Sequence, residues 1–400
     1  MIRHLFTLIW NRRRANFLLV TEILLAFVVL FAVGSLLVYN QQNYRSPLGF
    51  EYGQVWRVTI DPGSQPEAER TATLQQVVQR LQSIPGVQYL AYITSNTPFS
   101  GNSSNTDISR TKKEGASIGV NVYGMGDDMA KVLGLSIAQG RWFDKRDDAG
   151  TRPPILLSQD AQEALFPQQS AVGQLVYNNG GEYQVVGVVP NFRADGDLAS
   201  PKPAIFRRMS LQDSSFAKLS SFVSGFRLLV RVQPGAGAAL ERQMNTEITA
   251  IGKGWKVGIT PLSKQRAAQL KKVLTPIVAM VLSCVFLVVN VALGLFGVLW
   301  QTINQRRSEI GLRRAMGASA GAISGQVVGE ILVVTTFGLV LGLGVAAQFP
   351  LLGVLGVSVG VYLTAMVLAT GLIYALTAIC ALYPSRLAAG IHPAVALREE

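Results

Sequence analysis

The chain has 400 residues, of which 49% are hydrophobic and 15% are charged, and its mean hydropathy is +0.31. These values are typical of a membrane protein that carries a sizeable polar domain. The net charge of +12 is not gathered in a basic tract and no nucleic-acid-binding motif accompanies it, which excludes a nucleic-acid partner. Cys284 and Cys380 both lie in apolar stretches, so they indicate packing residues and not a disulfide framework or a metal site.

Four apolar stretches are long enough to cross a bilayer, which needs about 20 helical residues. We place the transmembrane helices at residues 17–39, 273–303, 323–346 and 361–383. The first follows three arginines and contains a small-x-small triplet, as a signal peptide does. Because its apolar run continues to Tyr39, we interpret it as an uncleaved helix, preceded by a cytoplasmic or interfacial helix at residues 1–16.

Segment 40–272 contains a weak internal repeat of strand, helix and strand. The first copy is expected at 56–60, 66–83 and 87–94, and the second at 226–232, 236–251 and 255–260. Such halves can pair into one four-stranded sheet with helices on one face, a ferredoxin-like α+β arrangement, with residues of about 95–225 as a mostly β insertion. Within the insertion we predict a loop at 95–117, strands at 119–123, 154–157 and 182–189, and a helix at 160–166.

The basic residues outside segment 40–272 indicate the orientation of the chain. They are Arg3, Arg12, Arg13, Arg14, Arg306, Arg307, Arg313, Arg314, Arg386 and Arg398. All lie on one side of a four-helix topology, whereas the short external loop 347–360 has no Lys or Arg. We therefore expect both termini, segment 304–322 and tail 384–400 in the cytoplasm, and the large domain outside. The expected location is the plasma membrane, which is the inner membrane in a diderm cell, with lipid as a partner.

Residues 306–319 form a short basic segment between the second and third spans. At about 100° per residue, Leu312, Ala315 and Met316 share one side of a helix and the arginines flank Ile310 on the other. Glu309 can pair with Arg313 one turn later, and Gly317 is suited to the C′ position that ends the helix. One interpretation is a membrane-interface loop held on anionic headgroups. The order of residues favours a docking element instead. Residues 264–272 are helix-permissive, so a stalk helix can run from the outer domain through the second span to this segment.

The segment follows the order R-x-x-E-I-G-x-x-[KR]-A-x-G-A. The matching residues are Arg306, Glu309, Ile310, Gly311, Arg314, Ala315, Gly317 and Ala318. This order closely resembles the cytoplasmic coupling segment of the MacB/FtsX-like permeases, which are membrane subunits of ABC transporters. The resemblance implies that these residues, with Arg313, sit in a groove of a separate ATPase and transmit its closure.

Other stretches carry the same resemblance. Residues 140–143, 165–167, 172–174 and 183–189 look like the MacB-like periplasmic core domain, and 383–388 with 392–399 look like the family's closing pattern. His392 replaces the acidic residue that is usual there, and the family's amino-terminal element is met only loosely by residues 11–16.

Three polar residues inside the spans are candidates for function, because polar groups in hydrocarbon are costly. Glu22 lies near the cytoplasmic interface, where a structural role is favoured over proton relay. Asn290 is expected to form an interhelical hydrogen bond. Glu330 matches the glutamate that follows the family's I-x-x-Q element, here Ile323 and Gln326, and is expected to organise the cytoplasmic end near the coupling segment.

The chain has no phosphate-binding loop and no catalytic motif, which predicts a non-enzymatic subunit without its own cofactor. The resemblance implies an ABC-type ATPase partner that holds ATP and magnesium, and a dimer with a second copy or a similar permease. The expected function is mechanical transmission to the outer domain for efflux of a peptide, antibiotic or lipoprotein-like substrate. The alternatives are an FtsX-like subunit that regulates an extracytoplasmic enzyme, and a receptor or scaffold without an ATPase.

Overall fold

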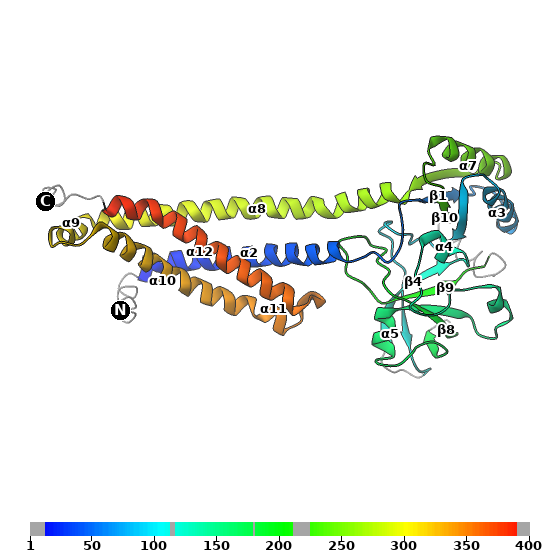
Figure 1. Ribbon diagram of the computed structural model, residues 1–400, viewed down its shortest axis with the longest axis horizontal. Helices are drawn as coiled ribbons and strands as arrows, with labels where there is room; N and C mark the ends of the chain where they lie inside the picture. The colour runs from blue at the N-terminus through cyan, green and yellow to red at the C-terminus, as the bar shows by residue number, and fades with distance from the viewer. Residues whose placement is uncertain (1–12, 113–116, 179–180, 211–224, 390–400) are drawn as a thin grey trace. The chain divides into compact units, whose positions relative to one another are not determined.

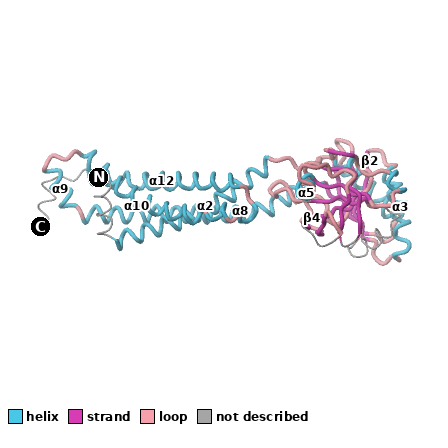
Figure 2. The backbone as a smooth tube through the Cα atoms, turned by 90° about the horizontal axis from the view of Figure 1, so that it is seen from below, coloured by secondary structure: helices cyan, strands magenta, loops and turns pink. Residues whose placement is uncertain are grey.

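The computed structural model describes residues 13–112, 117–178, 181–210 and 225–389. The expected amino-terminal helix at 1–16 falls largely outside them, as does the closing pattern that contains His392. The chain divides into two compact units, one of Met1–Gln42 with Thr275–Glu400 and the other of Asn43–Leu274. All described strands belong to the second unit (Figure 2).

Four helices are long and apolar enough to cross a membrane, as the sequence predicts. They are α2 (Arg13–Arg45), α8 (Leu262–Gln305), α10 (Ala320–Ala346) and α12 (Val359–Ala389). Helix α8 is continuous over 44 residues, which confirms the expected stalk-and-span helix. Helix α2 continues past the predicted end at Tyr39, because hydropathy marks where a helix leaves the apolar phase and not where its backbone hydrogen bonds stop. The short helices α11 (Gln348–Leu351) and η2 (Val354–Gly356) occupy the expected loop.

Helices α2, α8, α10 and α12 share one apolar core. Figure 1 shows α10 and α12 side by side in this unit. Two glycines of α10, Gly338 and Gly342, let α2 approach closely. A Cβ atom at Gly338 would lie 2.8 Å from Ile23, and one at Gly342 would lie 2.5 Å from the ring of Phe27. The small-xxx-small spacing therefore marks the contact of α10 with α2.

The first sheet of the second unit has four antiparallel strands in the order β11-β1-β10-β2. They are β1 (Val55–Asp61), β2 (Val87–Tyr92), β10 (Phe226–Val232) and β11 (Lys256–Pro261). Helices α3 (Glu67–Gln82) and α7 (Ala238–Ile251) share an apolar core with one face of this sheet. Each predicted strand-helix-strand segment thus supplies two strands to one sheet.

The second sheet has seven strands in the order β5-β8-β6-β9-β4-β3-β7. They are β3 (Asn105–Ser109), β4 (Ser117–Met125), β5 (Gln139–Gly140), β6 (Pro154–Ser158), β7 (Leu175–Asn178), β8 (Gly181–Val189) and β9 (Ala204–Arg208). Strand β7 also pairs with β8, so six of the strands form a closed ring around an apolar core. Helix α5 (Gln159–Leu165) packs against this sheet, whereas α4 (Met129–Leu133) contacts β2 and β10 of the first sheet, and the short 3₁₀ helix η1 (Lys145–Ala149) follows β5.

The prediction of a loop throughout 95–117 is wrong, because β3 lies within it. Strand β3 buries only Ile108, so it lacks the apolar alternation by which strands are recognised. Its backbone pairs with β4 over five residues and with β7 at Ser109, and this pairing, not an apolar pattern of its own, defines the strand.

Candidate functional site between helices α8 and α10

The basic segment forms helix α9 (Arg307–Ala315) between α8 and α10 (Figure 1). The segment 306–319 is helical only from Arg307 to Ala315. Gly317 has a φ of +94°, and its N–H donates to the carbonyl of Arg314 while that of Ala318 donates to Arg313. These two bonds close a Schellman motif, which confirms Gly317 at C′. Ser319 instead caps α10, its hydroxyl accepting from the amide of Ala322 at 3.2 Å.

One side of α9 is buried against the helices on either side of it. Ile310 is 6% exposed and packs with Ile303 of α8 and Ile323 of α10 in a small apolar cluster, with Ala318 against it. Gly311, next to Ile310, is also buried. Ile310 and Gly311 therefore fix which side of α9 faces the rest of the unit.

A chain of polar contacts extends from α9 to α10. Arg306 Nη1 lies 2.6 Å from Glu330 Oε2, and Gln326 donates to the other oxygen of Glu330 at 2.9 Å. Arg313 donates to Gln326 at 2.9 Å and to Glu309 at 2.5 Å. The predicted Glu309–Arg313 pair is confirmed, and Glu330 contacts the start of α9 as expected. Gln326 is the member that links the two ion pairs.

The opposite side of α9 is exposed in the described part of the chain. Leu312 is 51% exposed and Met316 is 74% exposed, and Ala315 is exposed between them. Arg314 donates to the carbonyl of Ala318 at 3.4 Å, while its Nε is buried without a hydrogen-bond partner. Leu312 and Met316 do not belong to the family motif, and it is the helical periodicity of the segment that places them on one side, as predicted.

Glu22 and Asn290 lie outside this network in the described part of the chain. The carboxylate of Glu22 packs against α8 at Gly294, where a Cβ atom would clash with it. Asn290 donates to the carbonyl of Phe286 at 2.8 Å, four residues earlier in its own helix. Within the described residues Asn290 bonds only its own helix and its side of α8 is exposed, so the expected interhelical bond stays a prediction.

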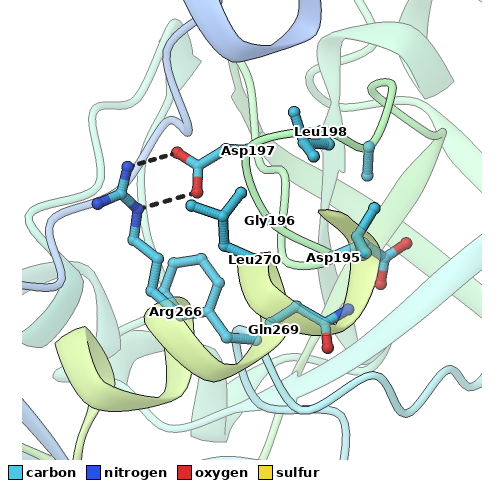
Figure 3. A pocket seen from close by; sticks show the side chains of 10 residues that line it. Asp195, Gly196, Asp197, Leu198, Arg266, Gln269 and Leu270 are labelled. Atoms are coloured by element: carbon cyan, nitrogen blue, oxygen red, sulfur yellow. Dashed lines mark hydrogen bonds and ion pairs between the residues drawn. The ribbon is translucent and has the colours of Figure 1, made fainter. Parts of the chain in front are cut away.

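The unit of Asn43–Leu274 has a cavity of about 170 Å³ beside the first turns of α8 (Figure 3). Arg266 makes two hydrogen bonds to Asp197, of 2.9 and 2.8 Å, and its guanidinium lies 4.8 Å from the ring centre of Tyr52. Asp195 pairs with Lys202 at 2.9 Å. Because these charges neutralise one another, the cavity offers a ligand mainly apolar contacts.

Two family models cover most of the chain. The MacB-like periplasmic core domain matches residues 17–247, and the FtsX-like permease C-terminal domain matches residues 280–393. The chain belongs to the MacB/FtsX-like permease family. Such a permease is a membrane protein of the ABC transporter class with an extracytoplasmic domain, and that domain is the unit of Asn43–Leu274.

Relatives of this permease include two proteins from different bacteria. "Macrolide export ATP-binding/permease protein MacB 2" of Aeromonas hydrophila is 25% identical over 355 residues, 86% of this chain and 52% of that protein. "Uncharacterized ABC transporter permease YknZ" of Bacillus subtilis is 25% identical over 229 residues, 56% of this chain and 55% of that protein. The permease thus spans about half the length of the curated relatives that it matches.

Two solved structures are similar to part of the permease. The periplasmic region of MacB from Actinobacillus actinomycetemcomitans is 16% identical, with a TM-score of 0.37 over 54% of this chain and 93% of that one. The extracellular domain of the transporter YknZ from Gram-positive bacteria is 14% identical, with a TM-score of 0.34 over 51% of this chain and 99% of that one.

Proposed function

We propose that this chain is the permease subunit of a MacB-like ABC transporter, and that a separate ATPase, carrying ATP and magnesium, binds helix α9. The exposed pair Leu312 and Met316 carries the proposal. Apolar side chains on a helix whose other side is anchored by Ile310 gain free energy when a partner groove covers them. The flanking arginines add a charge that an acidic groove can recognise.

The same arrangement supports mechanical transmission. Helix α8 runs without a break from Leu262 to Gln305 and is followed by α9, so a displacement of α9 acts on one end of a continuous helix. The distribution of Lys and Arg supports cytoplasmic termini and a cytoplasmic α9. The strand order β11-β1-β10-β2 supports a ferredoxin-like subdomain as the moving extracytoplasmic part. A dimer with two ATPases completes the assembly that we propose.

The substrate that we propose is a peptide, antibiotic or lipoprotein-like molecule expelled from the extracytoplasmic side. Several relatives are described as macrolide export proteins, which supports export. The comparisons do not favour the alternative of a regulatory subunit without transport. The roles assigned to the motif residues of α9 also remain proposals.

The decisive experiment changes the exposed side of α9 alone. A tagged chain with Leu312→Asp and Met316→Asp is purified from membranes, and the ATPase that accompanies the unaltered chain is identified and quantified. We expect loss of the ATPase with unchanged thermal stability of the permease. The matched control is Leu351→Asp, because Leu351 is 82% exposed but lies in the loop between α10 and α12. Equal recovery of the ATPase with the double variant would overturn the proposal.

The orientation has its own test. Cysteine replaces Ser308 of α9 or Ser100 of the large domain in a chain without Cys284 and Cys380, and a membrane-impermeant maleimide is added to cells with a permeabilised outer envelope. We expect labelling at position 100 and protection at position 308 until the inner membrane is opened. Labelling of both positions, or of position 308 alone, would contradict a cytoplasmic α9.

A further inference from the structure

Two arginines lie together on the four-stranded sheet of the extracytoplasmic unit. Arg57 of β1 and Arg227 of β10 alternate with Trp56, Val58, Phe226 and Leu228, which face the helices α3 and α7. Both arginines therefore point to the opposite face. Arg57 pairs with Leu229 and Thr59 with Arg227, so the two arginines are diagonal neighbours on adjacent strands. Long side chains at such positions are within reach of each other.

Neither arginine has an ion-pair partner in the described chain. Arg57 donates to the hydroxyl of Thr97 at 3.4 Å, and its Nε is buried without a hydrogen bond. Arg227 donates to the carbonyl of Gly225 at 3.1 Å. By contrast, Arg231 on the same strand and the same face bonds Glu51 at 2.6 Å.

This arrangement is unfavourable for the protein alone. Burial lowers the pKa of Arg57 below its ordinary value, and the charge of Arg227 lowers it further. Burial also lowers the pKa of Arg227. Guanidinium groups nevertheless keep their charge at neutral pH, so two half-buried like charges persist side by side. Both side chains remain partly open to solvent, so a small anion can reach them.

We propose that Arg57 and Arg227 form a binding site for an oxyanion, with the hydroxyl of Thr97 as a further donor. Guanidinium groups bind carboxylate and phosphate through paired hydrogen bonds, and a bound anion screens the two positive charges from each other. Thr97 is 2% exposed, so its hydroxyl is held in place beside Arg57. The site goes beyond the proposed function, because it lies in the extracytoplasmic unit and does not involve the ATPase.

The test measures binding of inorganic phosphate and of succinate to the full chain in detergent, by calorimetry and by the anion-dependent rise in Tm at constant ionic strength. We expect binding of at least one anion to the unaltered chain, weakened about ten-fold or more in Arg57→Gln and in Arg227→Gln. Phosphate binding alone identifies a phosphate-type ligand, succinate binding alone a carboxylate, and binding of both a general oxyanion site. The control Arg80→Gln removes an arginine that pairs with Glu247 on α7, and should leave binding unchanged.

The same variants should lose anion binding without losing stability. Without anion, Arg57→Gln and Arg227→Gln should be as stable as the unaltered chain or more so, because each removes a buried like charge. If either fails to fold, Arg57→Lys and Arg227→Lys keep the charge but lose the planar fork, and should still bind more weakly. Failure of the unaltered chain to bind either anion, or unaltered affinity in the arginine variants, would overturn the proposal.

Discussion

The first turns of α10 and its middle are held by different kinds of contact. At the start, Gln326 and Glu330 make hydrogen bonds and an ion pair to Arg313 and Arg306. In the middle, Gly338 and Gly342 lie against α2 with no space for even a methyl group.

The difference separates a fixed contact from an adjustable one. A glycine contact depends on the close approach of a backbone, and any displacement opens a void or produces a clash. Polar side chains on flexible stems can exchange partners while the helix stays in place. A displacement of α10 against α2 should therefore cost more free energy than a rearrangement of the bonds between α9 and Gln326 or Glu330. Three substitutions test this contrast.

The largest effect is expected from Gly342→Leu. The new side chain meets the ring of Phe27, which is fully buried and cannot move aside. Overpacking of this kind costs about 3 kcal/mol. Thermal unfolding in detergent, followed by far-UV circular dichroism, measures the loss. The control is Gly344→Ala in the same helix, where a Cβ meets open space, and which should be neutral or slightly stabilising. If the two variants unfold at the same temperature, the α2–α10 contact is not rigid.

A smaller effect is expected from Glu330→Gln. The side chains of Arg306 and Glu330 are 16% and 22% exposed, so loss of the carboxylate leaves a largely buried guanidinium with a weaker acceptor. We expect a destabilisation of about 1–2 kcal/mol. A double-mutant cycle with Arg306→Gln isolates the pair, and its coupling energy should be about 1 kcal/mol. A coupling energy near zero would show that α9 does not depend on this contact.

The sequence predicts long elements because their signals are local. Apolar length marks the four spanning helices, and period-2 or helical patterns place β1, β2, β10 and β11 with α3 and α7. Strand β3 is missed because its pairing with β4 and β7 is a property of the assembled sheet. The end of α2 is missed because Asn40 and Asn43 are polar yet still helical.

The sequence predicts the contacts of the candidate site that lie within one helix, but not those that join separate elements. Glu309–Arg313 and Gly317 follow from spacing within one helix, so the sequence suffices for them. The bond from Arg313 to Gln326 joins two helices through a turn, and no spacing rule fixes it. The unpaired state of Arg57 and Arg227 depends on strand register across some 170 residues, so only the folded sheet displays it.

The smallest effect is expected from Glu309→Gln. The side chains of Arg313 and Glu309 are 41% and 49% exposed, so solvent screens their attraction and the pair contributes about 0.3–0.5 kcal/mol. Arg313 keeps its bond to Gln326 in this variant, which should hold α9 in place. Thermal unfolding at low and high salt measures the change, which should shrink as salt screens the charge. A loss as large as that of Glu330→Gln would mean that α9 is held by its exposed pair, and would break the contrast between an adjustable α9 and a fixed α10.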